Sequence, residues 1–183
     1  MRALIAATAM LTIAAAPAFA CGTERWAVKT GADRDAAQVQ PNAQAATVSA
    51  LRMIPAPPNP NVRAVNRFPP TETTVFAVAA ILKVIKRETD QDYHLVIADP
   101  QTGQTMIIES PDPGCAAGSL FASQISEVRQ TINRRFRGPI GGRHLVQIPV
   151  NVIGIAFFDP IHGQEGVAPN GIELHPILSI SFN

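Results

Sequence analysis

The chain has 183 residues with 15 basic and 14 acidic side chains, so its formal net charge is only +1. A nearly neutral chain has no global attraction for nucleic acid or for an anionic membrane surface. The sequence contains one Trp and one Tyr, which excludes a broad aromatic surface for stacking bases. One hydrophobic core with an appended arm accounts for a chain of this length.

Residues 1–20 have the composition of a signal peptide. Arg2 precedes an apolar run from Ala3 to Ala16, and Ala18–Ala20 supplies an A-x-A cleavage box. The run is shorter than the roughly 20 residues that span a bilayer. We therefore expect a mature chain that begins at Cys21, is secreted to the periplasm or the extracellular space, and has no membrane span.

The two cysteines, Cys21 and Cys115, allow one disulfide in an exported chain. That bond would close a loop of about 95 residues and stabilise the fold by roughly 4 to 5 kcal/mol in the chain-entropy model. The alternative is lipid modification of Cys21, which would leave Cys115 as a free thiol. The residues before Cys21 lack the Leu-containing box of lipid-anchored proteins, and this favours the disulfide.

The N-terminal third of the mature chain divides into an arm and a linker. Residues 21–54 form a polar arm, with one short helix expected near its end. Six of the sixteen residues from Pro55 to Pro70 are proline, which predicts an extended linker at 55–70 without helix or strand. The folded domain is therefore expected at 71–183.

Five strands and one helix are expected in that domain. An apolar, β-branched run at 71–88 predicts a long, bent strand, and 93–110 predicts a hairpin whose turn is Asp99–Gly103. Apolar residues at spacings of three and four predict an amphipathic helix of about 17 residues with Ser119 as its cap. The last two strands are expected at 146–159 and 172–182.

The order of three strands, one helix and two strands is the order of the OB-fold, a five-stranded β-barrel. The sequence therefore predicts a mainly β protein with an OB-fold-like barrel. An α+β fold with an antiparallel sheet and one docked helix gives the same string of elements. The barrel is favoured because a single helix cannot cover a five-stranded sheet unless the sheet curls.

Two pairs of a carboxylate and a histidine are the candidates for chemistry. In the last strand Glu173 and His175 lie two residues apart, so they share one face. Asp92 and His94 have the same relation in the second strand. Together with His162 on the preceding loop, these five residues could hold a zinc or manganese ion. The opposite face of the last strand is expected to be apolar: Ile172, Leu174, Leu178 and Ile180.

A structural interpretation is open for the same residues. Strand histidines are commonly solvated or bonded to the backbone, and Asp92 lies in a turn, where an aspartate caps local amides. Pro176 interrupts its strand and predicts an edge or a bulge. No spacing matches H-E-x-x-H or another closed metal signature. The competing hypothesis is therefore a hydrogen-bond network that fixes the loop, with no cofactor.

Two functions are compatible with these patterns. The first is a binding or interaction module for a ligand or protein partner, which uses the loop at 160–171 and the adjoining strand faces. The second is a metal-assisted hydrolase, acting for instance on phosphodiesters, with His162, Glu173 and His175 as catalytic residues. The candidate residues of the binding loop are Asp159, His162, Gln164 and Asn170.

Several arginines gather near the end of the predicted helix. Cations at that position complement the helix dipole, which is a structural reason for them. The functional alternative is contact with the phosphates of a nucleic acid, which the neutral charge of the chain argues against. The residues concerned are Arg129, Arg134, Arg135 and Arg137, followed by Arg143.

Three segments resemble a family of uncharacterised small secreted bacterial proteins: ERWAVKTGAD (24–33), QDYHLVI (91–97) and FFDPIHGQEGVAPNGIELHPIL (157–178). The resemblance covers roughly residues 21–182. Its most specific part is the H-G-Q-x-G-x-A-P-N-x-I-E-L-H-P segment at 162–176. The resemblance implies a bacterial, secreted origin and supplies no functional residue.

Overall fold

The computed structural model describes residues 21–58 and 64–183. The predicted signal peptide at 1–20 and residues 59–63 of the predicted linker lie outside the described residues. The described part of 55–70 contains neither helix nor strand. Within the described ranges, no helix is both long enough and apolar enough to cross a membrane.

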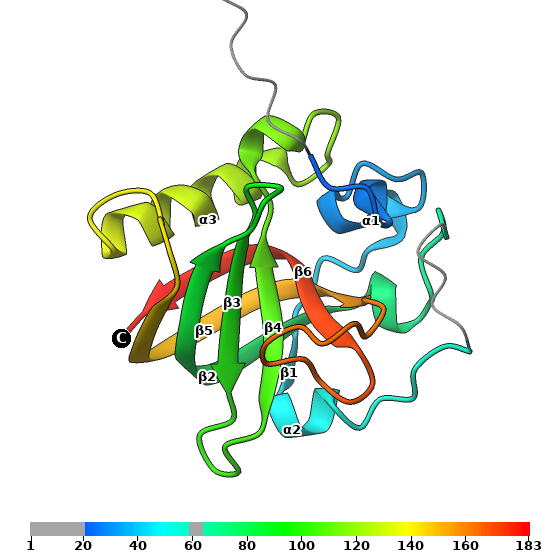
Figure 1. Cartoon of the computed structure of the whole chain (residues 1–183). Helices are drawn as coiled ribbons and strands as arrows, with labels where there is room; N and C mark the ends of the chain where they lie inside the picture. The colour runs from blue at the N-terminus through cyan, green and yellow to red at the C-terminus, as the bar shows by residue number, and fades with distance from the viewer. Residues whose placement is uncertain (1–20, 59–63) are drawn as a thin grey trace, which may run out of the picture.

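Six strands of the described chain form one sheet, and five of them close into a ring (Figure 1). The ring follows the order β2, β3, β4, β6 and β5, and β5 then pairs with β2. Within the ring, only the pairing of β4 with β6 is parallel. The predicted mainly β class is confirmed. The strands are β1 (Gln44–Ala46), β2 (Val75–Arg87), β3 (Tyr93–Ala98), β4 (Thr105–Ser110), β5 (His144–Phe158) and β6 (Ile172–Phe182).

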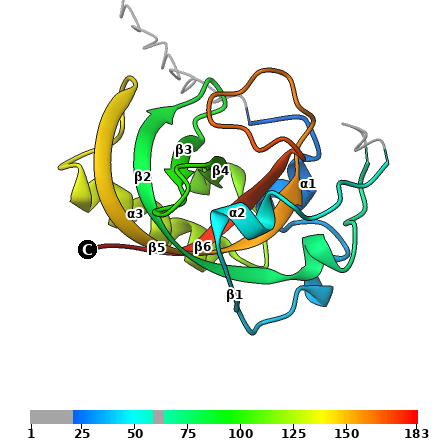
Figure 2. The same cartoon turned by 90° about the horizontal axis from the view of Figure 1, so that it is seen from below.

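Helices lie across the two ends of the ring (Figures 1 and 2). Buried side chains of α3 and of α2 join the same hydrophobic core as the strands, through Val128 and Ile132 at one end and Val48 and Leu51 at the other. The core therefore fills the inside of the ring. The helices are α1 (Trp26–Thr30), α2 (Val48–Leu51) and α3 (Ala122–Arg135), with single 3-10 turns η1 (Ala36–Gln38), η2 (Thr71–Thr73) and η3 (Pro113–Cys115).

The long strands bend where their pairing register shifts. β2 shifts between Leu82 and Val84, as expected of a long, bent strand. β6 shifts twice against β5 around Pro176, which confirms the predicted bulge. The expectation that Leu178 faces the core was wrong, because the bulge turns Ile177 inward and leaves Leu178 half-buried.

The helix α3 begins later than the sequence predicted. It has 14 residues, and the residue at its N-terminal cap is Phe121 rather than Ser119. The Ser119 hydroxyl accepts a hydrogen bond from the Phe121 backbone N–H and donates one to the Thr30 carbonyl. Ser119 therefore ties the arm to the start of the helix instead of capping it.

Arg129 does not belong to a surface patch. It is buried, its guanidinium stacks 3.5 Å from the centre of the Tyr93 ring, and it donates to the carbonyls of Gln91 and Ser110. Its inclusion among candidate phosphate contacts was wrong, because it is buried and both of its terminal guanidinium nitrogens already donate to the turn before β3 and the end of β4. Arg134, Arg135 and Arg137 remain exposed.

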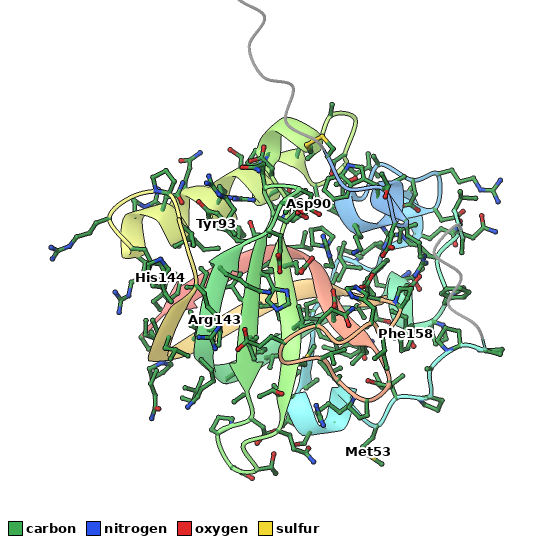
Figure 3. The ribbon with its side chains drawn as sticks, in the orientation of Figure 1. Met53, Asp90, Tyr93, Arg143, His144 and Phe158 are labelled. Atoms are coloured by element: carbon green, nitrogen blue, oxygen red, sulfur yellow. A yellow bond between two sulfur atoms is a disulfide. The ribbon has the colours of Figure 1, made fainter. Side chains whose placement is uncertain are left out.

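The arm packs on the ring, which the sequence left open. Val28 of α1 is fully buried, and β1 pairs in parallel with β2. Neither α1 nor β1 was expected from the sequence. The predicted disulfide between Cys21 and Cys115 is present and ties the start of the arm to η3 (Figure 3).

A buried ion pair also holds the arm. Arg25 and Glu72 meet through two contacts of 2.7 and 2.6 Å, and neither side chain is exposed. The Glu72 carboxylate also accepts the backbone N–H groups of Phe68 and Phe158. Each oxygen of Glu72 therefore has two donors.

Candidate functional site

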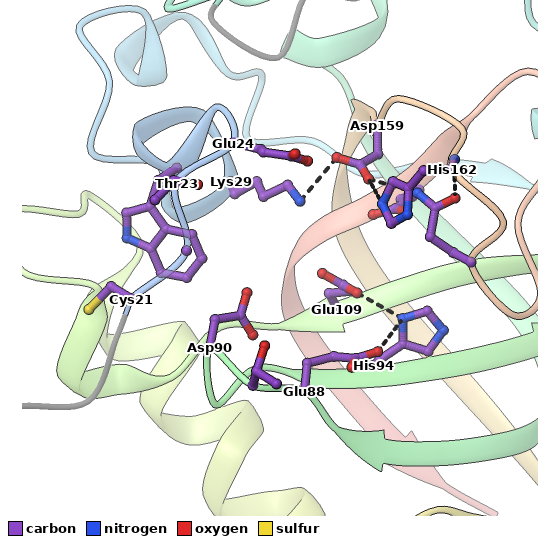
Figure 4. A pocket seen from close by; sticks show the side chains of 15 residues that line it. Cys21, Thr23, Glu24, Lys29, Glu88, Asp90, His94, Glu109, Asp159 and His162 are labelled. Carbon is purple, nitrogen blue, oxygen red and sulfur yellow. Dashed lines mark hydrogen bonds and ion pairs between the residues drawn. The ribbon is translucent and has the colours of Figure 1, made fainter.

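A cavity of about 440 Å³ opens on the outer face of the ring (Figure 4). The arm forms one wall, which includes Trp26 and Lys29. β3 and β4 form a second wall, which includes His94 and Glu109. Glu173 of β6 also lines the cavity. The loop at 159–171 completes the cavity. Segments from both ends of the sequence are therefore needed to enclose it.

His175 lies among three carboxylates directly beneath this cavity. Glu109 and Glu173 line the cavity, whereas His175 and Asp92 are buried outside its lining; these four side chains are called the floor. Its Nδ1 atom is 3.1 Å from Glu109 Oε2 and 3.8 Å from Glu173 Oε2. Its Nε2 atom is 3.7 Å from Asp92 Oδ2. The parallel pairing of β4 with β6, which sets Ile107 opposite Glu173, brings these residues together.

Four buried polar atoms of this floor lack a hydrogen-bond partner among the residues that the structure describes. The unpartnered atoms are Asp92 Oδ2, Glu173 Oε2 and both ring nitrogens of His175. His175 Nδ1 is within ion-pair distance of Glu109, but the two groups are not aligned for a hydrogen bond. Each buried, unpartnered polar group costs about 1 to 3 kcal/mol, so the cluster is well suited to bind an additional group.

Burial disfavours charge on two of these carboxyl groups. Burial raises the pKa of Asp92 to about 7, against the opposing effect of His175. Burial also raises the pKa of Glu173 above its ordinary value, and the neighbouring charge of Glu109 adds to the increase. Both groups would be stabilised as anions by a bound cation.

The other two groups favour their charged forms. Burial disfavours a charge on His175, but the carboxylates of Glu109 and Glu173 outweigh it and raise the pKa of His175 to about 9. Burial likewise opposes ionisation of Glu109, yet contacts with His175 and His94 hold its pKa well below the ordinary value. Glu109 is therefore the central anion of the cluster.

His94 orients Glu109 and the loop. Its Nδ1 atom is 2.9 Å from Glu109 Oε1, and its Nε2 atom is 2.9 Å from the Glu165 carbonyl oxygen. Burial opposes its charge, but the hydrogen bond with Glu109 raises the pKa of His94. Since both ring nitrogens are engaged, His94 acts on the site through Glu109.

His162 lies at the mouth of the cavity, apart from the floor. Its side chain is 62% exposed, and its Nε2 atom is 3.9 Å from Asp159 Oδ2. Asp159 itself is buried and pairs with Lys29, whose Nζ atom lies 3.0 Å from Asp159 Oδ1. The structure thus brings Asp92, Glu173 and His175 together but leaves His162 at the rim.

Two predicted binding residues shape the loop. The Gln164 amide donates to Asp159 Oδ2 and to the Pro160 carbonyl oxygen, so it holds the first turn of the loop. Asn170 is outside the lining of the cavity and donates to the carbonyls of Leu51 and Ile54. The loop therefore docks on the residues around α2 through Asn170.

Sequence reasoning missed Glu109 and Lys29. Burial opposes the charge of Lys29, but Asp159, Glu109 and Glu173 outweigh it and raise the pKa of Lys29 above its ordinary value. Glu109 could have been found from the sequence, because a hairpin that turns at Asp99–Gly103 sets Glu109 opposite His94. The structure has this pairing. No comparable local signal places Lys29.

Two groups of three side chains have ligand-type atoms that lie within 4.8 Å of one another in the described chain. One is Asp92, Glu109 and His175 at the floor, and the other is Glu24, Asp159 and His162 at the mouth. In the second group, Asp159 already pairs with Lys29. The floor is therefore the better candidate for a metal ion. Glu173 is not part of this group of three, but its Oε2 atom lies 3.8 Å from His175 Nδ1.

No protein-family model, curated protein or solved structure matches this chain. Function is therefore inferred from the geometry of the cavity itself.

Proposed function

We propose that the protein is a secreted, OB-fold-like domain that binds a divalent transition-metal ion, zinc or manganese, through His175, Glu109 and Glu173. The observation that carries the proposal is the position of His175 Nδ1, 3.1 Å from Glu109 Oε2 and 3.8 Å from Glu173 Oε2. The trio whose ligand atoms all lie within 4.8 Å of one another is Asp92, Glu109 and His175, so Glu173 would move toward Glu109 to complete the proposed ligand set. Ligand atoms of a tetrahedral zinc site, with bonds of about 2.0 to 2.1 Å, lie about 3.3 Å apart. One imidazole and two carboxylates suit zinc or manganese.

Asp92 and His94 orient the ligands in this proposal. Asp92 Oδ2 faces His175 Nε2 at 3.7 Å, on the side of the ring opposite to the metal position. At 3.7 Å the two atoms are not hydrogen-bonded. A carboxylate–histidine–metal triad, in which the carboxylate sets the tautomer and the orientation of the ring, would require Asp92 to move closer to His175. His94 holds Glu109 through its Nδ1 atom.

The proposed fold and location have separate support. The ring order β2, β3, β4, β6 and β5, with α3 between β4 and β5, is the strand order of the OB-fold barrel. OB-folds bind ligands on the face of their second and third strands; in the proposed assignment these strands are β3 and β4, beside the cavity. The composition of residues 1–20, the disulfide, and the resemblance to secreted bacterial proteins support export.

Calorimetric titration of the metal-free protein with zinc tests the metal site. We expect one zinc ion per chain, and a loss of affinity of at least about tenfold in Glu173→Gln and His175→Ala. His144→Ala is the matched control, because His144 is exposed on β5 and outside the cavity. Glu173→Gln removes a charge with little change of shape, so it tests the site even if His175→Ala does not fold. A wild-type protein that binds no zinc or manganese would contradict the proposal.

Metal-assisted hydrolysis is the second candidate function. It is favoured by the position of Glu109 and Glu173, which line the cavity and would leave a metal-bound water open to a substrate. His162 at the mouth could then accept a proton from that water, directly or through solvent. The surplus of carboxylates around the cavity disfavours an anionic phosphodiester and favours an ester or a peptide bond.

Assays on the zinc-loaded protein test the hydrolase function. We expect zinc-dependent cleavage of an ester or peptide substrate, with no cleavage of a phosphodiester. Activity should be lost in Glu173→Gln and should fall in His162→Ala without a change in zinc affinity. Zinc binding without cleavage of any substrate in the set would leave metal binding as the function.

A further inference from the structure

The cavity contains carboxylates that the described chain does not pair with a cation. Six carboxylates line the cavity, while the described lining residues include one lysine and no arginine. Lys29 pairs with Asp159, and Lys86 pairs with Glu88 at 2.7 Å. The six carboxylates are Glu24, Glu88, Asp90, Glu109, Asp159 and Glu173.

Glu24 and Asp90 have no cationic partner among the described residues. Figure 4 shows both directed toward the cavity, Glu24 from the arm and Asp90 from the turn before β3. Deeper in the cavity, the buried Glu173 Oε2 atom is also without a hydrogen-bond partner. Carboxylates whose charge or hydrogen bonding is incompletely compensated thus occur from the mouth to the floor.

Lys29 indicates what kind of group these carboxylates favour. Its side chain is only 14% exposed, yet its ammonium group is retained in the cavity by Asp159. The same carboxylate environment that holds this alkylammonium extends outward to Glu24 and Asp90. Lys29 pairs with Asp159 and leaves Glu24 and Asp90 without a cation from the described chain. A bound organic cation could therefore pair with these two carboxylates.

Trp26 supplies an apolar wall beside these charges. Its indole N–H donates to the Cys115 carbonyl oxygen at 3.3 Å, which fixes the ring in the wall of the cavity. The ring also packs closely on Gly22, where an added Cβ would lie 2.4 Å from it. An aromatic face next to carboxylates is a common site for an alkylammonium or guanidinium group.

We propose that the mouth of this cavity binds an organic cation, a ligand with a primary ammonium or guanidinium group, between Glu24 and Asp90, with its alkyl chain against Trp26. The inference goes beyond the metal site, since Glu24 and Asp90 are not among the proposed metal ligands. Binding of the cation is expected with or without zinc at the floor.

Calorimetry with cadaverine and with pentanol tests the proposal, because the two molecules share an alkyl chain and differ in charge. We expect cadaverine to bind zinc-loaded and zinc-free protein, more weakly as salt increases, and pentanol not to bind. Glu24→Gln and Asp90→Asn should each weaken cadaverine binding about threefold to tenfold. Both variants should keep the zinc affinity of the wild type. Glu127→Gln, at an exposed position of α3, is the matched control.

The outcomes separate this inference from the metal proposal. Cadaverine binding that falls in Glu24→Gln and Asp90→Asn supports the organic cation even if zinc does not bind. Equal binding of pentanol, or cadaverine binding that neither variant changes, would overturn the inference. It would also be overturned if a second zinc ion bound per chain and blocked cadaverine, because the mouth would then be a metal site of Glu24, Asp159 and His162.

Discussion

Glu72 and Glu173 are two fully buried glutamates in the same ring, and their surroundings are opposite. Both oxygens of Glu72 are saturated, with two donors from Arg25 and one each from the backbone of Phe68 and Phe158. Glu173 Oε2 has no hydrogen-bond partner, and the nearest cationic group, His175, is 3.8 Å away. Both sites bury a carboxyl group, but only the Glu72 site supplies a complete set of donors for it.

The difference separates a charge that stabilises the fold from one that is available for binding. A buried carboxylate with complete hydrogen bonds and a paired guanidinium holds two segments in place, here the arm and β5. A buried carboxylate without partners reduces stability, and folds retain such groups chiefly at functional sites. The contrast therefore supports a structural role for the Arg25–Glu72 pair and a binding role for the floor of the cavity.

Breaking the saturated site should have the largest effect on stability. Glu72→Gln leaves the Arg25 guanidinium buried without its counter-charge, so we expect the free energy of unfolding to fall by about 3 to 5 kcal/mol. Denaturant titration measures this loss. Molecules that still fold should bind zinc with wild-type affinity, because Glu72 does not line the cavity. A loss below about 1 kcal/mol would mean that the pair does not stabilise the fold.

Zinc should stabilise the unsaturated site by a smaller amount. At a free zinc concentration a hundred times the dissociation constant, the free energy of unfolding should rise by about 2.7 kcal/mol. Scanning calorimetry should show this as a higher melting temperature in the wild type and in His144→Ala. The increase should be reduced in Glu173→Gln at the same zinc concentration. An equal increase in Glu173→Gln would indicate that zinc binds elsewhere.

Local patterns were sufficient to predict most strands of the ring. The bounds of β6 follow from two-residue alternation, and the β3–β4 hairpin follows from the Pro and Gly residues of its turn. These signals depend on neighbouring residues only. The bulge at Pro176 was also predictable, but not its effect on Leu178, because the register shift depends on the pairing with β5.

The candidate site could be predicted only in part, because its residues meet through long-range pairings. Glu173 and His175 were found from their shared strand face. The pairing register of the β3–β4 hairpin, which sets Glu109 opposite His94, would have added Glu109. Lys29 enters the cavity because the arm packs on the ring, which no local pattern indicates. The burial of Arg129 also depends on a long-range contact, because its guanidinium packs on the Tyr93 ring. The sequence around Arg129 does not indicate this contact.

Asp99 provides a second saturated carboxylate for the comparison. It accepts hydrogen bonds from the backbone and hydroxyl of Ser49 and from the backbone of Gln101 and Thr102. Burial opposes its charge, but these bonds outweigh it and lower the pKa of Asp99 to about 2. A lowered folded-state pKa contributes stability that is present above the ordinary pKa of 3.8 and is lost as pH falls toward about 2.

Asp99→Asn should therefore destabilise the protein at neutral pH by roughly 1 kcal/mol, and the difference from the wild type should disappear at about pH 2. Denaturant titrations of both proteins across this pH range measure the difference. If the difference stayed constant with pH, the charge of Asp99 would contribute nothing, and its bonds would act as neutral ones do.

The smallest expected change gives the most direct test of the comparison. In metal-free protein, Glu173→Gln removes a buried charge that has no hydrogen-bond partner at Oε2, so stability should be unchanged or should rise by up to about 1 kcal/mol. Glu72→Gln is the matched substitution at the saturated site. Parallel denaturant titrations in the presence of a chelator compare the two. If Glu173→Gln cost as much as Glu72→Gln, the floor of the cavity would be a structural network like the Arg25–Glu72 pair, and its unpartnered atoms would no longer indicate a metal ligand.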